Sequence, residues 1–183
     1  MKSRGKLWGI FVVIFVLNAC SIQDLKKNLV VTGESGYNFT ESRKQWVRLS
    51  AEHKNSYSYS ILELSVTNNG SETSITVKNG KVTARDYEAF LISEEDGSRT
   101  ILSTYSEKKN ELGKHAEGAS PVTIDDLYET CLADYLVVDT EANTVYFDTN
   151  ETGVISLCGF VPNLCQDDCF VGFDISSFSW DTK

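Results

Sequence analysis

Two hydrophobic periods occur along this chain, and the first predicts a helix. Trp46, Leu49 and Val47 supply the apolar stripe of an amphipathic helix over residues 41–51, for which Thr40 is the expected N-cap. After this helix the apolar residues recur at every second position. That period is typical of strands with one buried face.

A shift in the alternation interrupts the first predicted strand. The apolar residues occupy odd positions and then change to even ones: Tyr57, Tyr59 and Ile61, followed by Leu62, Leu64 and Val66. Because a slip of one residue moves the inward-facing set to the other face, the pattern indicates a β-bulge. Asn68-Asn69-Gly70 is expected to end the strand.

The best local signal in the chain is Asn79-Gly80, which predicts a two-residue type I′ turn. This turn requires positive φ at both central residues, and asparagine and glycine adopt it most readily. The resulting hairpin places Val77 opposite Val82 and Ile75 opposite Ala84. The return strand is expected to continue through Tyr87, Ala89 and Leu91.

Residues 93–120 form a polar segment that glycines interrupt. A connection of this length is uncommon inside a compact domain, so two interpretations stay open: a mobile surface insertion or a binding loop. Ile101, Leu102 and Tyr105 are expected to form a short element within it.

A second helix is predicted to begin after Thr123. Thr123 and Asp126 have the spacing of a capping box, and Val122 is placed to pack against Leu127. Leu127 and Cys131 lie four residues apart on one helix face, so Cys131 is expected to point inward.

Four more strands are predicted after this helix, at residues 135–138, 144–148, 154–160 and 170–178. The connections between them are too short for parallel crossovers, so antiparallel pairing is expected. The order helix, strands, helix, strands therefore predicts an α+β fold. In this fold two helices pack on an antiparallel sheet within a single domain, residues 37–183, that disulfides cross-link.

The first twenty residues have the pattern of a bacterial lipoprotein signal. An apolar stretch, residues 7–17, follows three basic residues, Lys2, Arg4 and Lys6. At about 1.5 Å per residue this stretch reaches only about half of a bilayer core, so it is a signal and not a membrane span. Leu17-Asn18-Ala19-Cys20 resembles a lipobox, which implies removal of residues 1–19, acylation of Cys20 and a tether over residues 20–36.

The residue after the acylated cysteine indicates the membrane. In bacteria with the usual sorting rule an aspartate there favours retention in the inner membrane. This chain has Ser21 instead. We therefore expect a protein attached to the outer membrane through Cys20 and facing the periplasm.

The charge of the chain is uneven. Without residues 1–19 it has 14 basic and 26 acidic residues, and residues 121–183 hold 12 acidic residues against one base, Lys183. Such a surface repels phosphate backbones, so no nucleic-acid partner is expected. It would attract a basic protein or a divalent ion, although a solvated acidic face that keeps the domain soluble explains the same pattern.

Four cysteines remain after Cys20, an even number that predicts disulfides in an exported protein: Cys131, Cys158, Cys165 and Cys169. Three pairings are open, and we favour Cys165 with Cys169 across a short turn and Cys131 with Cys158 between a helix and a strand. Zinc is disfavoured because there is no CxxC pair and both histidines, His53 and His115, lie far away in sequence. Neither a metal nor a cofactor is expected.

No residue is assigned a catalytic role. The chain has no GxSxG elbow, and Cys131 is better explained as disulfide-bonded or buried than as a nucleophile. Helix capping explains Asp125-Asp126, whereas Asp167-Asp168 offers carboxylates for Ca²⁺ without the spaced DxDxDG loop. Three aromatic residues are candidates for an interface, although alternating aromatics in strands are more often core: Tyr57, Tyr59 and Trp180.

Several segments of the chain occur together in one known group of proteins. They are the Trp46 helix, Tyr57-Ser58-Tyr59-Ser60, the Asn79-Gly80 hairpin, Thr123-Ile124-Asp125-Asp126-Leu127-Tyr128, Val145-Tyr146-Phe147-Asp148, Gly153 and Phe173-Asp174-Ile175 before Phe178. From about residue 42 to 178 the chain resembles bacterial secreted proteins and lipoproteins that carry domain of unknown function 6174. The resemblance implies no activity, and residues 93–120 and the cysteine-rich turn depart from the pattern.

These observations together predict a membrane-anchored envelope lipoprotein whose domain is a non-enzymatic binding or structural module. One alternative is an inhibitor or sensor of a basic envelope-active protein such as lysozyme, because of the acidic C-terminal third. Another is a hydrolase whose site is not legible in the sequence.

Overall fold

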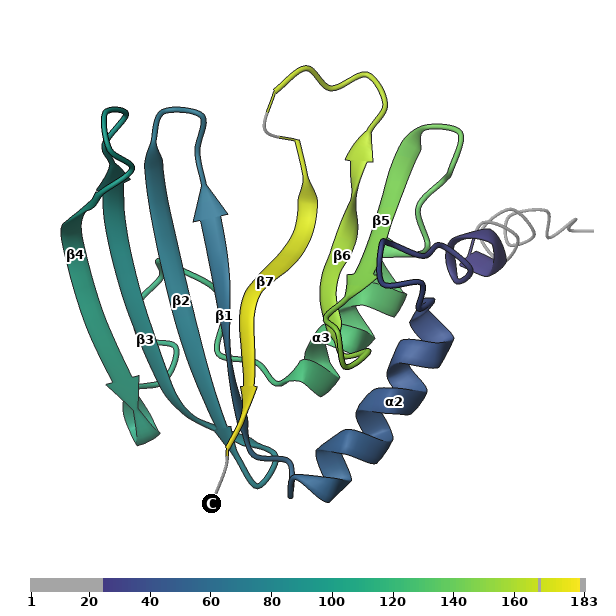
Figure 1. Cartoon of the computed structure of the whole chain (residues 1–183), viewed down its shortest axis with the longest axis horizontal. Coiled ribbons are helices and arrows are strands. Elements are labelled where there is room, and N and C mark those ends of the chain that lie inside the picture. Colours follow the sequence, from purple (N-terminus) through teal and green to yellow (C-terminus); the bar gives the residue numbers. More distant parts are fainter. Residues whose placement is uncertain (1–24, 168, 182–183) are drawn as a thin grey trace, which may run out of the picture.

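The computed structural model describes residues 25–167 and 169–181. A helical turn at residues 25–28 comes first. The elements that follow are α2 (Phe39–Glu52), β1 (Tyr57–Leu64), β2 (Asn69–Lys78), β3 (Lys81–Ile92), β4 (Arg99–Lys108), the 3₁₀ turn η1 (Lys109–Glu111), α3 (Ile124–Thr130), the π-helical turn η2 (Cys131–Tyr135), β5 (Asn143–Thr149), β6 (Ile155–Pro162) and β7 (Val171–Trp180) (Figure 1).

The seven strands form one antiparallel sheet in the order β4-β3-β2-β1-β7-β6-β5. The last strand of the chain thus lies in the middle of the sheet, between β1 and β6 (Figure 1). The predicted α+β class, the single domain and the antiparallel pairing are confirmed. The consequence for function is that a four-stranded half, β1 to β4, joins a three-stranded half, β5 to β7, only through the β1–β7 pair.

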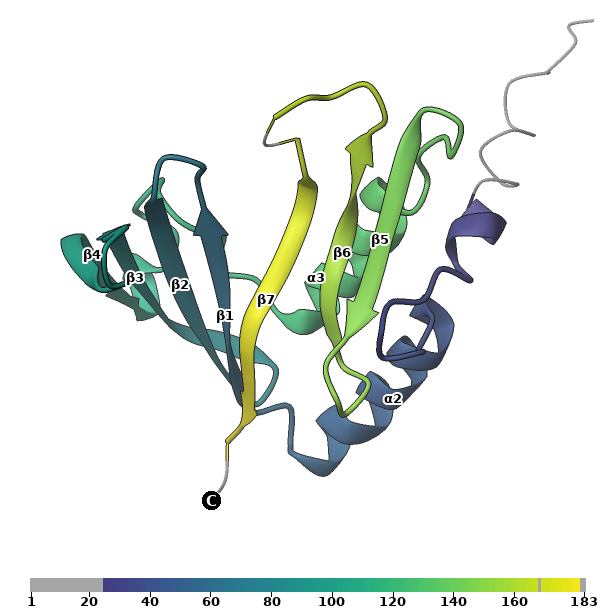
Figure 2. The ribbon, with the colours of Figure 1, turned by 45° about the horizontal axis from the view of Figure 1, so that its top comes forward.

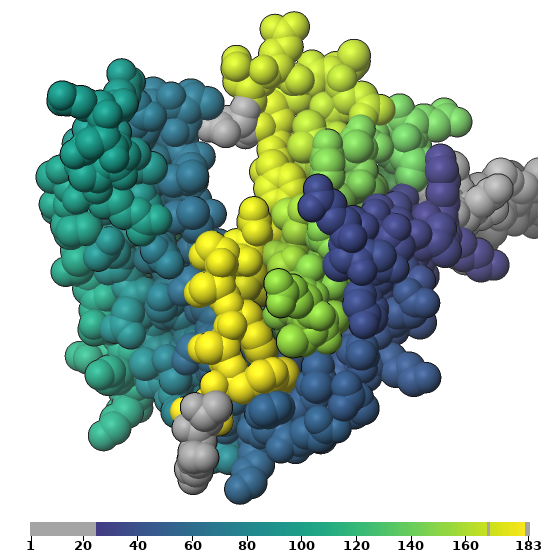
Figure 3. All heavy atoms as spheres, viewed as in Figure 1, coloured from purple at the N-terminus to yellow at the C-terminus, as the bar shows by residue number. Residues whose placement is uncertain are grey.

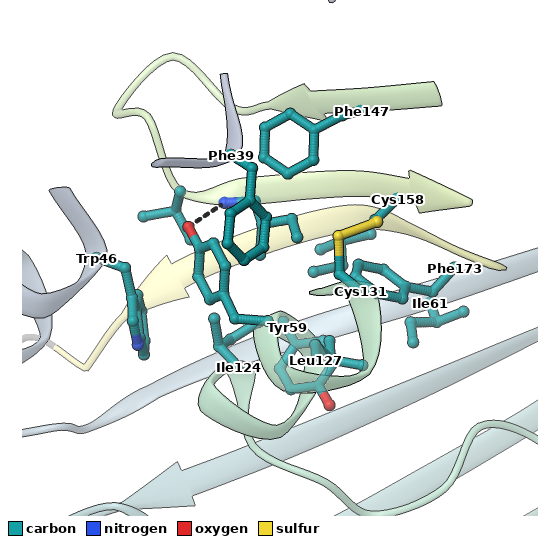
Figure 4. Close-up of a cluster of buried hydrophobic side chains, with 14 of the residues drawn as sticks. Phe39, Trp46, Tyr59, Ile61, Ile124, Leu127, Cys131, Phe147, Cys158 and Phe173 are labelled. Carbon is teal, nitrogen blue, oxygen red and sulfur yellow. Dashed lines mark hydrogen bonds between the residues drawn. A yellow bond between two sulfur atoms is a disulfide. The ribbon is translucent and has the colours of Figure 1, made fainter. Parts of the chain in front are cut away.

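Both long helices pack on one face of the sheet (Figure 2). The core between these layers contains the fully buried side chains of Trp46, Tyr57 and Tyr128 and the Cys131–Cys158 disulfide (Figure 4). The Tyr128 hydroxyl accepts a hydrogen bond from the amide of Ile155 at 3.0 Å, which the close-up shows as a dashed line. This bond ties α3 to the start of β6.

The predicted first helix exists but begins two residues earlier than expected. Its N-cap is Asn38 and not Thr40: the Asn38 side chain accepts from the Glu41 amide at 3.1 Å, and the Glu41 carboxylate accepts from the Asn38 amide at 3.2 Å. Phe39 is the first residue of the helix and is buried, so Thr40 lies inside the first turn. In the stripe, Trp46 is buried, whereas Val47 is 58% exposed.

The predicted capping box of the second helix is confirmed, because Thr123 and Asp126 exchange both bonds. The strand predicted at residues 135–138 is wrong. The helix continues into η2, and the turn after it buries Leu136. The side-chain amide of Asn28 donates to the carbonyls of Leu136 and Val138 at 3.0 and 3.1 Å, so these carbonyls are paired outside any sheet.

The hairpin at Asn79-Gly80 is confirmed, with φ of 49° and 73° at the two residues. Val77 lies opposite Val82 as expected, but Ile75 lies opposite Arg85 and not Ala84. A bulge between Thr76 and Val77 shifts the register by one residue. It therefore turns Arg85 onto the helix-covered face, where its side chain is buried.

Nearly half of the polar segment at residues 93–120 is regular structure, so it is not one long loop. It contains the ten-residue strand β4, at the edge of the sheet. Ile101 and Leu102 are exposed on this edge strand, which is why the segment lacks the alternation of a half-buried strand. The later part lies on the sheet, where the Ala119 amide donates to the Thr73 hydroxyl at 3.0 Å.

The folded unit also begins earlier than the predicted boundary at residue 37. Leu25, Leu29 and Val31 pack against the core, and Asn28 is buried. The Asp148 carboxylate accepts from the amides of Glu34 and Ser35, which fastens this segment to β5. Most of the predicted tether at residues 20–36 therefore belongs to the domain, whereas the signal and Cys20 lie outside the described residues.

Candidate functional site

The two halves of the sheet separate above the β1–β7 pair. That ladder joins Tyr57 to Trp180 at one end and Ile61 to Ile175 at the other. Beyond it, residues 62–64 of β1 pair only with β2, and residues 171–174 of β7 pair only with β6. The result is a cleft of about 410 Å³, which opens between the halves in Figure 3.

A bulge begins this separation. The register of β1 against β7 shifts between Ser60 and Ile61, and the extra residue is Ser176 of β7. Because β1 pairs with β2 without a register shift, the bulge lies in β7 and not in β1, where the phase slip predicted it. The apolar residues after the slip do not enter the core. Leu64 and Val66 are 53% and 80% exposed, because β1 has already left the helix-covered part of the sheet.

Two facing glycines hold β7 against β6 and away from β1. Gly159 and Gly172 are cross-strand partners. A Cβ on Gly172 would lie 2.2 Å from the Cys158 carbonyl oxygen, and one on Gly159 would lie 2.4 Å from that of Val171. The ring of Phe170 covers the space above Gly159. A side chain at either glycine would push the two strands apart.

The cleft combines apolar walls with two carboxylates. Its lining residues come from both walls: Ile61, Leu62, Glu63, Leu64, Phe170, Gly172, Phe173, Asp174 and Ser176. Glu63 accepts one hydrogen bond, from the Ser71 hydroxyl at 3.1 Å. Asp174 has no hydrogen bond or ion pair within residues 25–167 and 169–181, and desolvation by the surrounding protein raises the pKa of its carboxyl.

The Cys165–Cys169 disulfide lies in the loop between β6 and β7. The pairing of the four cysteines is the one we favoured. Cys165 is exposed, whereas Cys131 and Cys158 are fully buried. Leu164 of the same loop is 95% exposed.

A buried ion pair that the sequence did not predict lies on the helix-side face of β3 and β4. The Arg85 guanidinium contacts the Glu107 carboxylate at 3.2 Å, and both side chains are almost completely buried. Arg85 also donates to the carbonyls of His115 and Glu117. The pair thus fastens the later part of the predicted loop to the sheet.

Glu107 is held in its charged form. Burial alone would raise the pKa of this carboxyl, but hydrogen bonds from the backbone amides of His115 and Gly113, and from the side chains of His115 and Arg85, lower it to about 2. Among the described buried side-chain polar atoms, only the Arg85 Nε lacks a hydrogen-bond partner. These contacts explain how the Arg85–Glu107 pair stays ionised although it is buried, as a structural feature of the fold.

The described residues give no arrangement of a nucleophile with a base. His115 contacts Glu107 through Nδ1 at 2.9 Å, and His53 stacks on Trp180. Within the described ranges, neither histidine ring has a hydrogen bond to a serine or cysteine side chain. Asp125 accepts from Arg43 and from the Trp46 indole, and Asp126 caps α3.

Three other candidate groups can be placed. Tyr57 and Tyr59 are core residues, and desolvation raises the pKa of both phenols. Trp180 is half-buried and stacks on Trp46. In the described part of the chain no three His, Cys, Asp or Glu side chains form a group that could hold a metal ion; Asp168 lies outside this part.

No family model matches the chain, and no match was found among curated proteins or solved structures. Membership of the group with domain of unknown function 6174 therefore stays a prediction. None of the described helices is long and apolar enough to cross a membrane.

Proposed function

We propose that this chain is a lipid-anchored envelope protein whose domain is a non-enzymatic binding module, and that the cleft between β1 and β7 is its binding site. The observation that carries the proposal is the opening in the middle of a continuous sheet. Soluble domains normally close or protect free strand edges and apolar surface. In this cleft the free strand edges and the apolar surface are both accessible, and they lie beside Asp174, a carboxylate without a partner among the described residues.

The cleft has the features of a binding site. Its volume of about 410 Å³ falls in the usual range for ligand pockets, about 300–1,000 Å³. Its walls combine apolar side chains with the polar groups of Glu63, Asp174 and Ser176, and strands form both walls. A site on rigid elements keeps its shape before the ligand arrives, which lowers the entropic cost of binding.

The anchor can be tested separately from the domain. Cells grown with labelled palmitate should incorporate the label into the wild-type protein, and Cys20→Ala should abolish the incorporation. Globomycin should leave a longer, unprocessed precursor, and the mature protein should fractionate with the outer membrane. Label that persists in Cys20→Ala would overturn the lipidation proposal.

The binding site can be tested by photo-cross-linking in intact cells. A photoreactive amino acid at Leu64 would sit on the cleft wall, and the same amino acid at Val47 would sit on α2. The two positions are a matched pair, with 53% and 58% exposure. We expect discrete covalent adducts from position 64 and none from position 47. Absence of adducts at position 64, or the same adducts from both positions, would contradict a cleft-based binding function.

A second candidate is the binding of a basic envelope-active protein by the acidic C-terminal third. Among its described carboxylates, Asp125 and Asp181 are ion-paired and Asp126 caps a helix, whereas others such as Glu129 and Asp134 are in no ion pair with a described residue. Electrostatic attraction would make association fall steeply with ionic strength. Binding to lysozyme that is equal at low and moderate salt, or absent at low salt, would count against this candidate.

A further inference from the structure

We propose that the cleft binds an extended polypeptide segment that pairs as a β-strand with the free edge of β7 and carries lysine or arginine among apolar residues. This inference rests on the proposed binding function and names its ligand class. The ligand is defined by its backbone conformation and its charge pattern.

The free edge of β7 supplies the first argument. In a strand, successive backbone N–H and C=O groups point to alternate sides, so each strand needs a neighbour on both sides to pair them all. Residues 171–174 have β6 on one side and the cleft on the other. At about 3.3 Å per residue this edge is about 13 Å long, enough to pair with three or four residues of a peptide. Such strand addition is a known mode of peptide recognition.

The side chains beside this edge supply the second argument. Phe173 and Ile175 are buried on the helix side, so the alternation places Asp174 on the opposite, outer face, the face of Phe170. On the other wall Ile61 is buried on the helix side, which places Leu62 and Leu64 on the outer face. A peptide strand in the cleft would therefore meet apolar side chains on its outer face from both walls.

Charge supplies the third argument and fixes the sign of the ligand. The alternation places Glu63 on the helix-side face of the cleft and Asp174 on the outer face. No described lysine or arginine forms an ion pair with either carboxylate, although five other carboxylates have such partners. An acidic peptide would be repelled by both walls. A basic residue on each face of the peptide would supply the missing counter-charges.

The probe is a fluorescent, N-terminally acetylated hexapeptide of sequence Val-Val-Lys-Lys-Val-Val, with binding to the purified domain measured by anisotropy. Its two adjacent lysines point to opposite faces when the peptide is extended. One matched peptide replaces lysine with glutamate. A second keeps every side chain but carries an N-methyl group on every backbone nitrogen, so neither of its edges can donate hydrogen bonds to β7. We expect the parent peptide to bind, and both matched peptides to lose at least about tenfold in affinity.

The protein variants are Asp174→Asn and Glu63→Gln, alone and together. The control is Glu151→Gln, which removes the same charge from an exposed turn between β5 and β6, at the end of the sheet away from the cleft (Figure 1). Since an exposed ion pair contributes up to about 1 kcal/mol, we expect the double variant to weaken binding about three- to tenfold and the control to change it less than twofold.

The outcomes separate the ligand class from the binding function. Equal binding of the parent and N-methylated peptides, or equal effects of the cleft and control variants, would overturn strand pairing in the cleft. No binding of the parent peptide up to millimolar concentration would also overturn it. If any of these results occurs but the photoreactive amino acid at Leu64 still forms cross-links, the cleft is a binding site for another class of ligand. Absence of the cross-links would remove the function itself.

Discussion

The two disulfides should contribute unequally to stability, and they provide a clear test of the fold. Cys131–Cys158 joins positions 27 residues apart and lies in the core, whereas Cys165–Cys169 joins positions four residues apart in a surface loop. The perturbation is the replacement of both cysteines of one pair with alanine, made for each pair in turn. The two variants remove the same atoms, so their difference reports on position and loop length.

The expected magnitudes follow from loop closure in the unfolded chain. The chain-entropy relation gives about 3.5 kcal/mol for the 27-residue separation and about 2 kcal/mol for the four-residue separation at 25 °C. A domain of this size loses about 2–4 °C of Tm per kcal/mol. We therefore expect Tm to fall by about 7–14 °C for the core pair and about 4–8 °C for the loop pair. The void left by two buried sulfur atoms would enlarge the first value.

The assays are urea unfolding at 25 °C and thermal unfolding of the three proteins, with mass spectrometry of the wild type. The untreated domain should be four hydrogens lighter than the reduced form and have no free thiol. Under a limiting reductant the Cys165–Cys169 pair should open first, because Cys165 is exposed and the core pair is not. An equal or larger loss of stability for the loop pair would refute the reasoning. So would two or more free thiols in the oxidised domain.

Three further predictions concern buried polar contacts. Tyr128→Phe should destabilise the domain by about 1–3 kcal/mol in urea unfolding, because it leaves the Ile155 amide without its acceptor. Burial alone would raise the pKa of the Asp148 carboxyl, but hydrogen bonds, first from the Ser35 hydroxyl, lower this pKa overall. The charged carboxylate therefore stabilises the fold at neutral pH, and this stabilisation is lost as pH falls below about 4. The protection factor of the Ser35 amide, which corrects for the pH dependence of intrinsic exchange, should therefore fall in acid, and Asp148→Asn should lower it at all pH values; a high, pH-independent protection factor in the variant would contradict this. Glu107→Gln should destabilise the domain more than the double replacement Arg85→Met with Glu107→Leu, since the single change leaves a buried charge without its counter-ion; equal losses would contradict it.

The sequence predicted elements whose determinants are local. The Asn79-Gly80 turn and the Thr123 capping box each depend on a few adjacent residues with defined backbone requirements, and both are confirmed. The disulfide pairing that we favoured among the three open ones is also confirmed.

The predictions that failed depended on tertiary contacts. The apolar run at residues 135–138 has high strand propensity, but the helix before it continues into a π-turn and Asn28, more than 100 residues earlier, pairs with two of its carbonyls. The length of β4 was underestimated, as a short element with Ile101, Leu102 and Tyr105, because both faces of this ten-residue strand are largely exposed. Arg85 was placed in the wrong register because one extra residue in the hairpin turned it inward.

The cleft could be predicted only in part. The phase slip predicted an irregularity near Ile61, but it placed it in the first strand and not in β7. Nothing local indicates that the last strand of the chain pairs beside the first. That pairing brings Glu63 and Asp174, 111 residues apart, into one cavity. The facing pair Gly159 and Gly172 carries a signal, since glycine inside a strand often marks a close approach of two backbones.

The most direct test of the binding cleft is backbone hydrogen exchange of the domain with and without the lysine–valine hexapeptide. In the free domain, those amides of residues 62–64 and 171–174 that point into the cleft should exchange fast, and core amides such as that of Ile75 should exchange slowly. The peptide should protect the cleft amides of β7 and leave Ile75 unchanged. Unchanged exchange at residues 171–174 under saturating peptide, or protection centred on another surface, would contradict the account.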